Sequence, residues 1–438
     1  MQLVVPQKHF GARGFFMALL TVNIFVTVAI DIYAPALPGM QRSFGVTAGY
    51  LNLTMFAYFL FSAVGVFFAG PIADLKGSRP VSCAGAILFM AGSFLCAASP
   101  SVELLTLARI LQAIGYGFVL TMITVMVKDS YAGKDLKTAM TMLQSLILIG
   151  PVAAPFVGTF ILTVTTWRGI FVFLGVLGAV NTVLFFLMQE THAGSLPSVR
   201  AKALAKGSGS ADALAGQPQP ADASDSEWAH SPAAPTLGQS MGSMMQGMKQ
   251  LLRQRKFVSL ALLMGVAGAP YFAFIAVVSY VLLDYFGTSY GIYNLVYAVS
   301  CLITLVAPFV YSFMSERAGS NRVLVFCMAL AGLSVALLAV CGHAGPWLFL
   351  LAFAPALLCE GIVRPLAFVD LLDNQPSERV GAASSLANMS YSVITSLATV
   401  LATLPWTTFV FGLDVITAGA LVIMAGLFVF GITRPERL

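Results

Sequence analysis

Four ionisable residues lie inside long apolar stretches of the sequence: Asp31, Arg109, Glu360 and Arg364. A charged side chain is costly to place inside a bilayer, so residues of this kind usually belong to binding sites or ion pathways. A carboxyl group held away from water can bind and release protons at physiological pH. An arginine stays charged and needs a carboxylate, a polar group or a substrate beside it. These residue types therefore indicate proton or cation binding together with substrate binding.

Asp31 lies in the outer part of the first apolar stretch, in the segment Asp31-Ile-Tyr33-Ala-Pro35-Ala-Leu-Pro38. Proline removes a backbone donor, so the two prolines predict that the first helix kinks or ends here. We interpret Asp31 as a proton or cation site. The alternative is an interfacial aspartate that marks the end of the helix.

Arg109 lies in the fourth apolar stretch, in Leu107-Ala-Arg109-Ile-Leu-Gln112-Ala-Ile-Gly115. It is expected either to bias the protonation of a nearby acid or to hold two helices together, and we favour the first role. Glu360 and Arg364 are four residues apart and share one helix face, which favours a local neutralising pair. A substrate or proton role for this pair is the alternative.

The composition indicates that lipid surrounds most of the chain. Of the 438 residues, 58% are hydrophobic and 9% are charged, whereas soluble domains carry about 25% charged residues. Apolar stretches long enough to cross a bilayer recur along the sequence. The expected spans are residues 13–34, 50–72, 79–99, 103–126, 139–164, 168–189, 258–283, 289–313, 321–341, 345–370, 379–404 and 409–431. This predicts an all-α membrane protein with twelve transmembrane helices.

A polar segment divides these spans into two sets of six. It is rich in Ala, Gly, Ser and Pro, which predicts a disordered linker. We expect an N-terminal bundle over 1–190, a linker over 191–256 and a C-terminal bundle over 257–438. Residues 241–256 carry methionines, leucines and bases, so they are expected to form an amphipathic surface helix or a solvated basic end.

The distribution of lysine and arginine predicts the orientation, because cytoplasmic loops hold the excess of these residues. With the N-terminus inside, the outer loops receive Arg42 and Arg168. The inner side receives Lys8, Arg13, Lys76, Arg79, Lys128, Lys134, Lys137, the linker bases, Arg317, Arg322, Arg379, Arg434 and Arg437. Both termini and the linker are therefore expected in the cytoplasm.

Two glycine-containing segments complete the pattern. Gly70-Pro-Ile-Ala-Asp74-Leu-Lys-Gly77-Ser-Arg79 follows the second span and aligns weakly with Ser312-Phe-Met-Ser-Glu316-Arg-Ala-Gly319 in the second half. Internal repeats of this kind are typical of secondary transporters. In the fifth span, Gly150-Pro151-Val-Ala-Ala-Pro155-Phe-Val-Gly158 places small residues on one stripe, which permits close helix approach.

Together these motifs resemble the major facilitator superfamily. Gly70 to Arg79 is similar to its signature loop, Arg109 to Gly115 to its helix 4 motif, and Gly150 to Gly158 to its helix 5 antiporter motif. The segment from Asp31 to Pro38 resembles the helix 1 motif of Bcr/CflA-type drug:proton antiporters. The likeness implies two six-helix pseudo-symmetric halves and no enzyme activity.

The resemblance also implies roles for the residues that carry it. Asp31 and Arg109 would couple protons to transport, Gly70, Asp74, Gly77 and Arg79 would form a gating loop, and Gly150, Pro151, Pro155 and Gly158 would form the antiporter motif. The sequence departs from the family pattern at Ser78, Ala154, Thr159, Ser320 and Asn321.

The expected function is proton-coupled efflux of small amphipathic compounds or drugs across a bacterial inner membrane by alternating access. A cationic substrate would have Asp31 as its counter-charge. Candidate cavity residues are Tyr33, Tyr58, Met122, Tyr271, Phe274, Tyr297, Glu360 and Arg364. The alternative on the same fold is a dedicated exporter or importer of one metabolite, such as a sugar, siderophore or amino acid derivative.

The expected partners are a small-molecule substrate, protons and the lipid bilayer, with a monomeric chain and no nucleic acid. The six cysteines fall singly in apolar segments and no histidine cluster lies beside them, so no metal site is predicted. No cofactor is expected, and no Gly-x-x-x-x-Gly-Lys-Ser/Thr motif for ATP occurs. Gly287-Thr-Ser289-Tyr-Gly291 matches a hydrolase motif superficially but lies in a predicted loop without a histidine partner.

Overall fold

The structure is a computed structural model and describes residues 7, 10–131, 135, 136, 138–140, 142, 143, 149–191, 237–315, 317, 319–373, 375 and 380–432. Regular secondary structure in these residues is entirely helical. Most of the predicted linker, together with Glu316, Arg379, Arg434 and Arg437, lies outside the described residues. The expected all-α architecture is confirmed.

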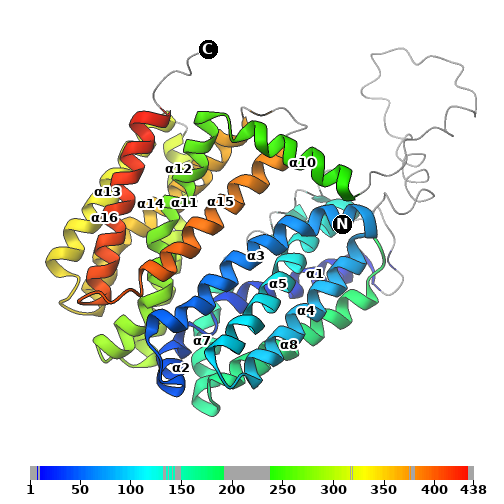
Figure 1. The fold of residues 1–438 in the computed structure, drawn as a ribbon, viewed down its shortest axis with the longest axis horizontal. Helices are drawn as coiled ribbons and strands as arrows, with labels where there is room; N and C mark the ends of the chain where they lie inside the picture. The colour runs from blue at the N-terminus through cyan, green and yellow to red at the C-terminus, as the bar shows by residue number, and fades with distance from the viewer. Residues whose placement is uncertain are drawn as a thin grey trace, which may run out of the picture.

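The N-terminal helices form one side of the molecule (Figure 1). In chain order they are α1 (Ala12–Asp31), the 3-10 turn η1 (Ala34–Ala36), α2 (Leu37–Phe44), α3 (Ala48–Lys76), α4 (Ser78–Ala98), α5 (Val102–Ser130), α7 (Ile149–Val164) and α8 (Trp167–Leu187). Long apolar helices of this kind satisfy their own backbone hydrogen bonds, as a membrane requires.

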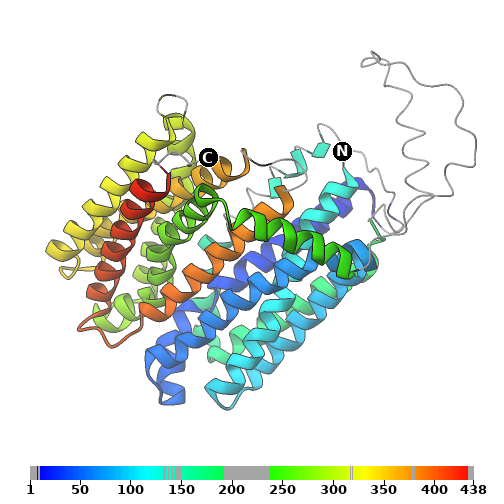
Figure 2. The ribbon, with the colours of Figure 1, turned by 45° about the horizontal axis from the view of Figure 1, so that its top comes forward.

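The C-terminal helices pack beside them (Figures 1 and 2). They are α10 (Leu237–Leu251), α11 (Arg255–Ser279), the π-helical turn η5 (Tyr280–Tyr285), α12 (Tyr290–Ser315), α13 (Ser320–Cys341), α14 (Pro346–Asp373), α15 (Val380–Leu401), α16 (Phe409–Leu427) and the π-helical turn η7 (Phe428–Ile432). Each predicted span overlaps a helix, although the ends differ. For the fifth span, residues 141 and 144–148 lie outside the described residues, and α7 covers only its second part.

Ten of the described helical segments are long and apolar enough to cross a membrane, and the helix over Gly150–Val164 is shorter. The first span differs most from expectation, because it continues to Phe44 instead of ending near residue 34. The two prolines interrupt this helix without ending the span. Pro35 enters the 3-10 turn and Pro38 lies in the first turn of α2.

The helix ends fall on two sides of the bundle. We call the side with Gly77, the end of α5 and α10 the linker side, and the side with Gly45, the start of α5 and η5 the far side. Part of the segment expected as a surface helix or a solvated basic end is helical, as α10, which contacts α3 and α15 at the linker side (Figure 2).

The hydrophobic core is continuous between the two sets of helices on the far side. Phe274, Tyr297 and Phe353 of α11, α12 and α14 belong to the same buried cluster as the N-terminal helices. On the linker side, the C-terminal helices form a separate cluster that includes Leu324 and Leu366. The two sets are therefore packed together on the far side and separate toward the linker side.

Glycines allow α7 to lie directly against the break in α1. A Cβ at Gly158 would clash with the Ile32 carbonyl oxygen, and one at Gly150 would clash with the Thr27 side chain. Small residues permit this close approach, as the sequence pattern predicts. The interruption of α1 after Asp31 is thus packed against α7, and neither Gly150 nor Gly158 of α7 can be replaced by a larger residue without a clash.

We predict that Gly158→Ala lowers the free energy of unfolding by about 1–3 kcal/mol, the usual cost of overpacking. Thermal unfolding of the purified protein in detergent would measure this loss. Gly419→Ala in α16 is the matched control, because a Cβ there meets nothing within 4 Å. That control is expected to be neutral or slightly stabilising, since alanine favours helix. Equal losses in the two variants would contradict the packing argument.

Candidate functional site

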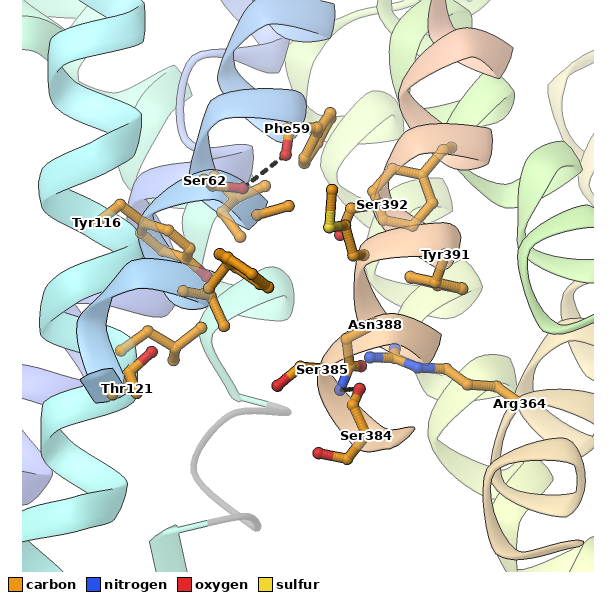
Figure 3. A pocket seen from close by; sticks show the side chains of 18 of the residues that line it. Phe59, Ser62, Tyr116, Thr121, Arg364, Ser384, Ser385, Asn388, Tyr391 and Ser392 are labelled. Atoms are coloured by element: carbon orange, nitrogen blue, oxygen red, sulfur yellow. Dashed lines mark hydrogen bonds between the residues drawn. The ribbon is translucent and has the colours of Figure 1, made fainter. Parts of the chain in front are cut away.

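A cavity of about 500 Å³ lies between the N-terminal and C-terminal helices (Figure 3). Its lining includes Phe67 and Gly70 toward the end of α3, and Ser384 and Ser385 near the start of α15. These segments lie on the linker side. The cavity therefore opens toward that side, where the two hydrophobic clusters are separate.

The two long walls of the cavity differ in character. The wall from α3 and α5 is mostly apolar and includes Phe59, Val66 and Leu120. The wall from α15 carries a polar stripe at helical spacing. This stripe consists of Ser384, Ser385, Asn388, Tyr391 and Ser392. An amphipathic molecule matches such a pair of surfaces.

Aromatic rings form the inner end of the cavity and connect the two sets of helices. Tyr116 and Tyr58 have ring centroids 5.6 Å apart, and Phe59 contacts Phe272 at 4.9 Å. Phe272 in turn contacts Tyr391 edge-on at 5.8 Å. We call these five residues the aromatic floor. Offset and edge-to-face pairs of this kind add stability beyond the area that they bury.

Arg364 is the charged residue in the lining of this cavity. Its side chain is exposed and its guanidinium lies 4.6 Å from the centroid of the Tyr391 ring. The Tyr391 hydroxyl donates to Glu360 Oε1 at 2.9 Å. Glu360 is buried, at 3% exposure. The predicted neutralising pair thus interacts across Tyr391, since no ion pair within 4 Å joins these two described residues.

Asp31 lies beyond the aromatic floor, at the last residue of α1. It is 3% exposed, and its neighbour Ile30 lines the cavity while Asp31 itself does not. Tyr297 of α12 lies beside the carboxyl group and interacts with it. Among the described residues, Asp31 Oδ1 has no hydrogen-bond partner. The acid is therefore buried beside a residue of the cavity lining.

The hydroxyl groups around Asp31 are also unusual. The Tyr33, Tyr58, Tyr293 and Tyr297 hydroxyls are buried without a hydrogen-bond partner in the described part of the chain. Each of them lies close enough to interact electrostatically with Asp31. Buried polar atoms are normally satisfied, so such a cluster is typical of a site that handles protons, water or a ligand.

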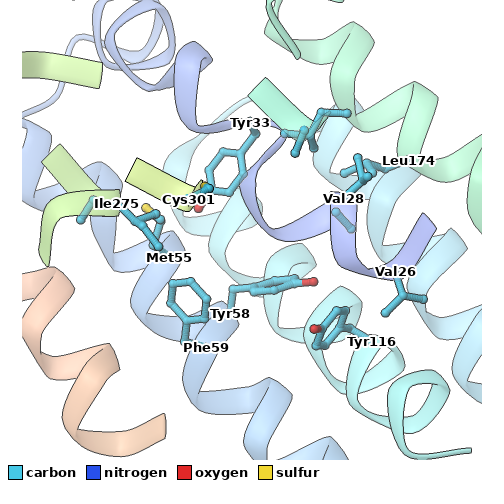
Figure 4. Close-up of a cluster of buried hydrophobic side chains, with 14 of the residues drawn as sticks. Val26, Val28, Tyr33, Met55, Tyr58, Phe59, Tyr116, Leu174, Ile275 and Cys301 are labelled. Atoms are coloured by element: carbon cyan, nitrogen blue, oxygen red, sulfur yellow. The ribbon is translucent and has the colours of Figure 1, made fainter. Parts of the chain in front are cut away.

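Arg109 is held by aromatic faces. Its guanidinium carbon lies 4.2 Å from the Tyr33 ring centroid and 4.0 Å from that of Tyr58. Nη1 donates to Gln112 Oε1 at 2.7 Å, and Gln112 Nε2 donates to Ser93 at 2.7 Å. Figure 4 shows the Tyr33, Tyr58 and Tyr116 rings clustered beside α5. Cation–π contacts are strongest where water is excluded, as it is here.

Asp31 and Arg109 are therefore brought to one place without forming a direct ion pair within 4 Å. Tyr33 links the two positions, because its ring faces Arg109 and it follows Asp31 by two residues in the chain. The two residues can influence each other through this tyrosine. The arrangement is compatible both with coupling and with holding α1 against α5.

The segment predicted as a gating loop binds the end of α8. Glu190 accepts hydrogen bonds from the Ser78 backbone and side chain and from the Arg79 backbone, at 2.9, 2.7 and 3.1 Å. Arg79 Nη2 donates to the Phe186 carbonyl at 2.8 Å. Gly77 has φ of 91°, and a Cβ there would clash with the Glu190 carboxylate. A glycine is therefore required; the side chain of Asp74 lies outside the described residues.

The far side is closed by contacts between the two sets of helices. Arg42 of α2 pairs with Asp284 of η5 at 3.1 Å. Asn294 of α12 donates to Thr159, next to Gly158 in α7, at 2.8 Å. Asn52 of α3 donates to the Ala276 carbonyl at 3.3 Å. These contacts join the two sets of helices on the far side.

The predicted cavity residues divide into three groups. Arg364 lines the open cavity, and Tyr58 belongs to its floor. Tyr33, Tyr297 and Glu360 are buried around the two charged sites, as described above. Phe274 stacks in the far-side core and Met122 is buried against Ala69 and Val81, whereas Tyr271 lies against Phe272. Of these eight predicted residues, Arg364 is in the described lining of the cavity and the other seven are not.

Several site residues were missed by the sequence analysis. Tyr116 lies seven residues after Arg109 and so on the same face of α5, which is a usable signal. Asn388 and Tyr391 lie on the polar stripe of α15, which could be found as helical periodicity of polar residues. Glu190 carries no such signal, because its contact with Gly77 joins residues far apart in sequence.

Comparisons with known proteins agree with the fold. Residues 19–399 and 260–437 match the family model of the Major Facilitator Superfamily. An uncharacterized MFS-type transporter of Bacillus subtilis (strain 168), YdgK, is 23% identical over 383 residues, covering 86% of this chain and 85% of its own. The crystal structure of a POT family transporter in complex with 5-aminolevulinic acid superposes with a TM-score of 0.70. It is 16% identical and covers 98% of this chain and 99% of its own, which shows likeness of fold alone.

Several relatives carry resistance names, and two of them illustrate the extent of the match. Multidrug resistance protein D of Escherichia coli (strain K12) is 33% identical over 186 residues, which is 42% of this chain and 47% of its own. The chloramphenicol resistance protein of Pseudomonas aeruginosa is 31% identical over 176 residues, 39% of this chain and 42% of its own. The chain thus matches less than half the length of either relative.

We predict that Arg109→Lys lowers the free energy of unfolding by about 2–4 kcal/mol, because it removes two desolvated ring contacts and leaves the Gln112 oxygen without its donor. Arg168→Lys is the matched control. Arg168 also faces a ring, Trp167 at 4.4 Å, but it is exposed. That control is expected to lose about 1 kcal/mol or less. Thermal unfolding would compare them, and similar losses would contradict the buried stack.

Proposed function

Because the chain belongs to the major facilitator superfamily of membrane transporters, we propose that it is a proton-coupled exporter of small amphipathic compounds. It would work by alternating access, with the N-terminal and C-terminal helices rocking as two units around the cavity. The observation that carries this proposal is the buried Asp31 next to the open cavity.

The position of Asp31 supports proton coupling. An ionised carboxylate is costly to bury without a cation beside it. Within the described part of the chain Asp31 has no such ion pair, and it does not line the cavity although its neighbour Ile30 does. Loading and release of its proton therefore depend on how far the floor admits water. A movement of α1, α3 or α5 that accompanies substrate binding would change that access.

The contacts of the far side support alternating access. The Arg42–Asp284 pair has side-chain exposures of 71% and 39%, and such pairs contribute about 0–1 kcal/mol. The remaining crossing contacts are single hydrogen bonds and apolar packing. The polar links of this closure therefore cost little to break, whereas its apolar packing must separate when the far side opens.

The distribution of bases supports a cytoplasmic linker side in a bacterial inner membrane. Arg42 and Arg168 lie on the far side, while Lys76, Arg79 and Lys128 lie on the linker side with α10. In this orientation, the cavity opens to the cytoplasm. Substrate would enter there and leave through the far side.

The character of the cavity supports amphipathic substrates. One wall is apolar and one is polar, and its volume lies within the range of small-molecule sites. The resistance names of two relatives point the same way. A dedicated transporter of one metabolite is the second candidate, favoured by the regular polar stripe on α15.

The test is substrate-induced proton movement in proteoliposomes, measured with a trapped pH dye. Chloramphenicol and a panel of neutral, anionic and cationic aromatic compounds would be added to wild type and to Asp31→Asn. We expect one or more compounds to move protons in wild type, and the variant to fall to background because its amide cannot carry a proton.

Asp373→Asn is the matched control, since this exposed carboxylate lies at the linker-side end of α14. It is expected to keep the wild-type response. Proton movement that persists in Asp31→Asn would refute coupling through this residue. Substrate counterflow without any proton movement would favour the metabolite transporter.

A further inference from the structure

Arg364 is a cation with an unoccupied hydrogen-bonding face. Its guanidinium makes no hydrogen bond or ion pair within the described part of the chain, and its recorded partner is the Tyr391 ring. The nearest acid, Glu360, is buried and already accepts the Tyr391 hydroxyl. Figure 3 shows the guanidinium reaching toward Asn388 and Ser385 on α15, at the cavity. The donors of Arg364 therefore remain free for a ligand.

We propose that Arg364 binds an oxyanion of the substrate, so that the cavity takes small aromatic compounds carrying one carboxylate or a similar group. This inference rests on the proposed transport function and specifies its substrate class. A guanidinium presents paired donors that match the two oxygens of a carboxylate. Asn388 and Ser385 supply further polar atoms beside it.

The rest of the cavity matches the aromatic part of such a compound. Phe59 and Phe272 of the aromatic floor, together with Phe67 of α3, give the cavity an aromatic surface. A ring placed against them would direct its anionic end across the cavity to Arg364. The ligand would thus be oriented by one apolar surface and one charge, as is usual in small-molecule sites.

Charge distribution argues against a cationic substrate. No aspartate or glutamate belongs to the described lining of the cavity. Asp31, the expected counter-charge for a cation, lies behind the aromatic floor. A cation entering this space would meet Arg364 without a neighbouring carboxylate. Repulsion between like charges is strong where water is partly excluded.

The experiment measures binding of three probes of nearly equal shape to the purified full chain in lipid nanodiscs by calorimetry. The probes are 2-naphthoate, 2-naphthamide and 2-naphthylmethylammonium, which are anionic, neutral and cationic. We expect naphthoate to bind about tenfold tighter than naphthamide, a difference of about 1.4 kcal/mol, and the ammonium compound to bind most weakly.

Arg364→Met is expected to abolish the preference for naphthoate over naphthamide, whereas Arg364→Lys keeps part of it because the charge remains. Arg168→Met is the control, since this arginine lies on the far side against Trp167. Elution of each variant as a folded, monodisperse species is checked first. If Arg364→Met does not fold, Arg364→Lys decides. It must still bind naphthoate more tightly than naphthamide, but by a smaller factor than wild type, because an ammonium group cannot form the paired hydrogen bonds of a guanidinium.

The proposal is overturned if the ammonium probe binds as tightly as naphthoate, if Arg364→Met keeps the wild-type preference, or if no probe binds below about 1 mM. Failure of proton coupling is distinguishable, because these measurements use no proton gradient. Naphthoate preference without Asp31-dependent proton movement would preserve this inference and remove the proton-coupled function.

Discussion

The break in α1 after Asp31 is the feature on which the rest of the site depends. Pro35 cannot donate a backbone hydrogen bond, so α1 stops and the chain passes through a 3-10 turn into α2. The Ile32 carbonyl at the break lies against Gly158 of α7. This contact fixes where the carboxyl group of Asp31 and the ring of Tyr33 lie. It also directs α2 toward η5, where Arg42 meets Asp284.

The aromatic floor separates two charged environments that must communicate in a coupled transporter. Arg364 faces the open cavity, and Asp31 and Arg109 lie behind the rings. The tyrosine hydroxyls around Asp31 have no hydrogen-bond partner in the described residues. Such groups are costly to leave unsatisfied. A modest shift of the floor that admits water or a proton would therefore be stabilised by the hydrogen bonds that it allows.

Much of the fold could be predicted from the sequence, because hydropathy and helix-breaking residues act locally. The apolar stretches coincide with helices, and the prolines near residue 35 correctly predicted an interruption. The charged residues of the site were conspicuous for the same reason, since few charges occur in apolar stretches. The extension of the first span to Phe44 was not predicted. The 3-10 turn η1 accommodates Pro35 and connects α1 to α2, so the span continues beyond the prolines.

The partners of these residues could not be predicted. The stacking of Arg109 between Tyr33 and Tyr58 joins α5 to α3 and to the turn after α1, and the spacing of residues within α5 does not specify contacts with two other segments. Phe274 was proposed for the cavity on residue type, yet it stacks in the far-side core. Aromatic type alone does not distinguish a cavity wall from a core. The supporting contact of Glu190 with Gly77 depends on tertiary packing in the same way.

The most direct test of the account is whether Asp31 sets the balance between the two open states. Spin labels at Ser43 and Thr407 would report distances across the far side, and labels at Lys76 and Asp373 would report the linker side; all four positions are exposed. Double electron–electron resonance in nanodiscs at acidic and alkaline pH should show both distance distributions shifting in opposite directions in the wild-type background. The account predicts that Asp31→Asn removes this pH response. An identical response with and without the Asp31 carboxyl group would contradict it.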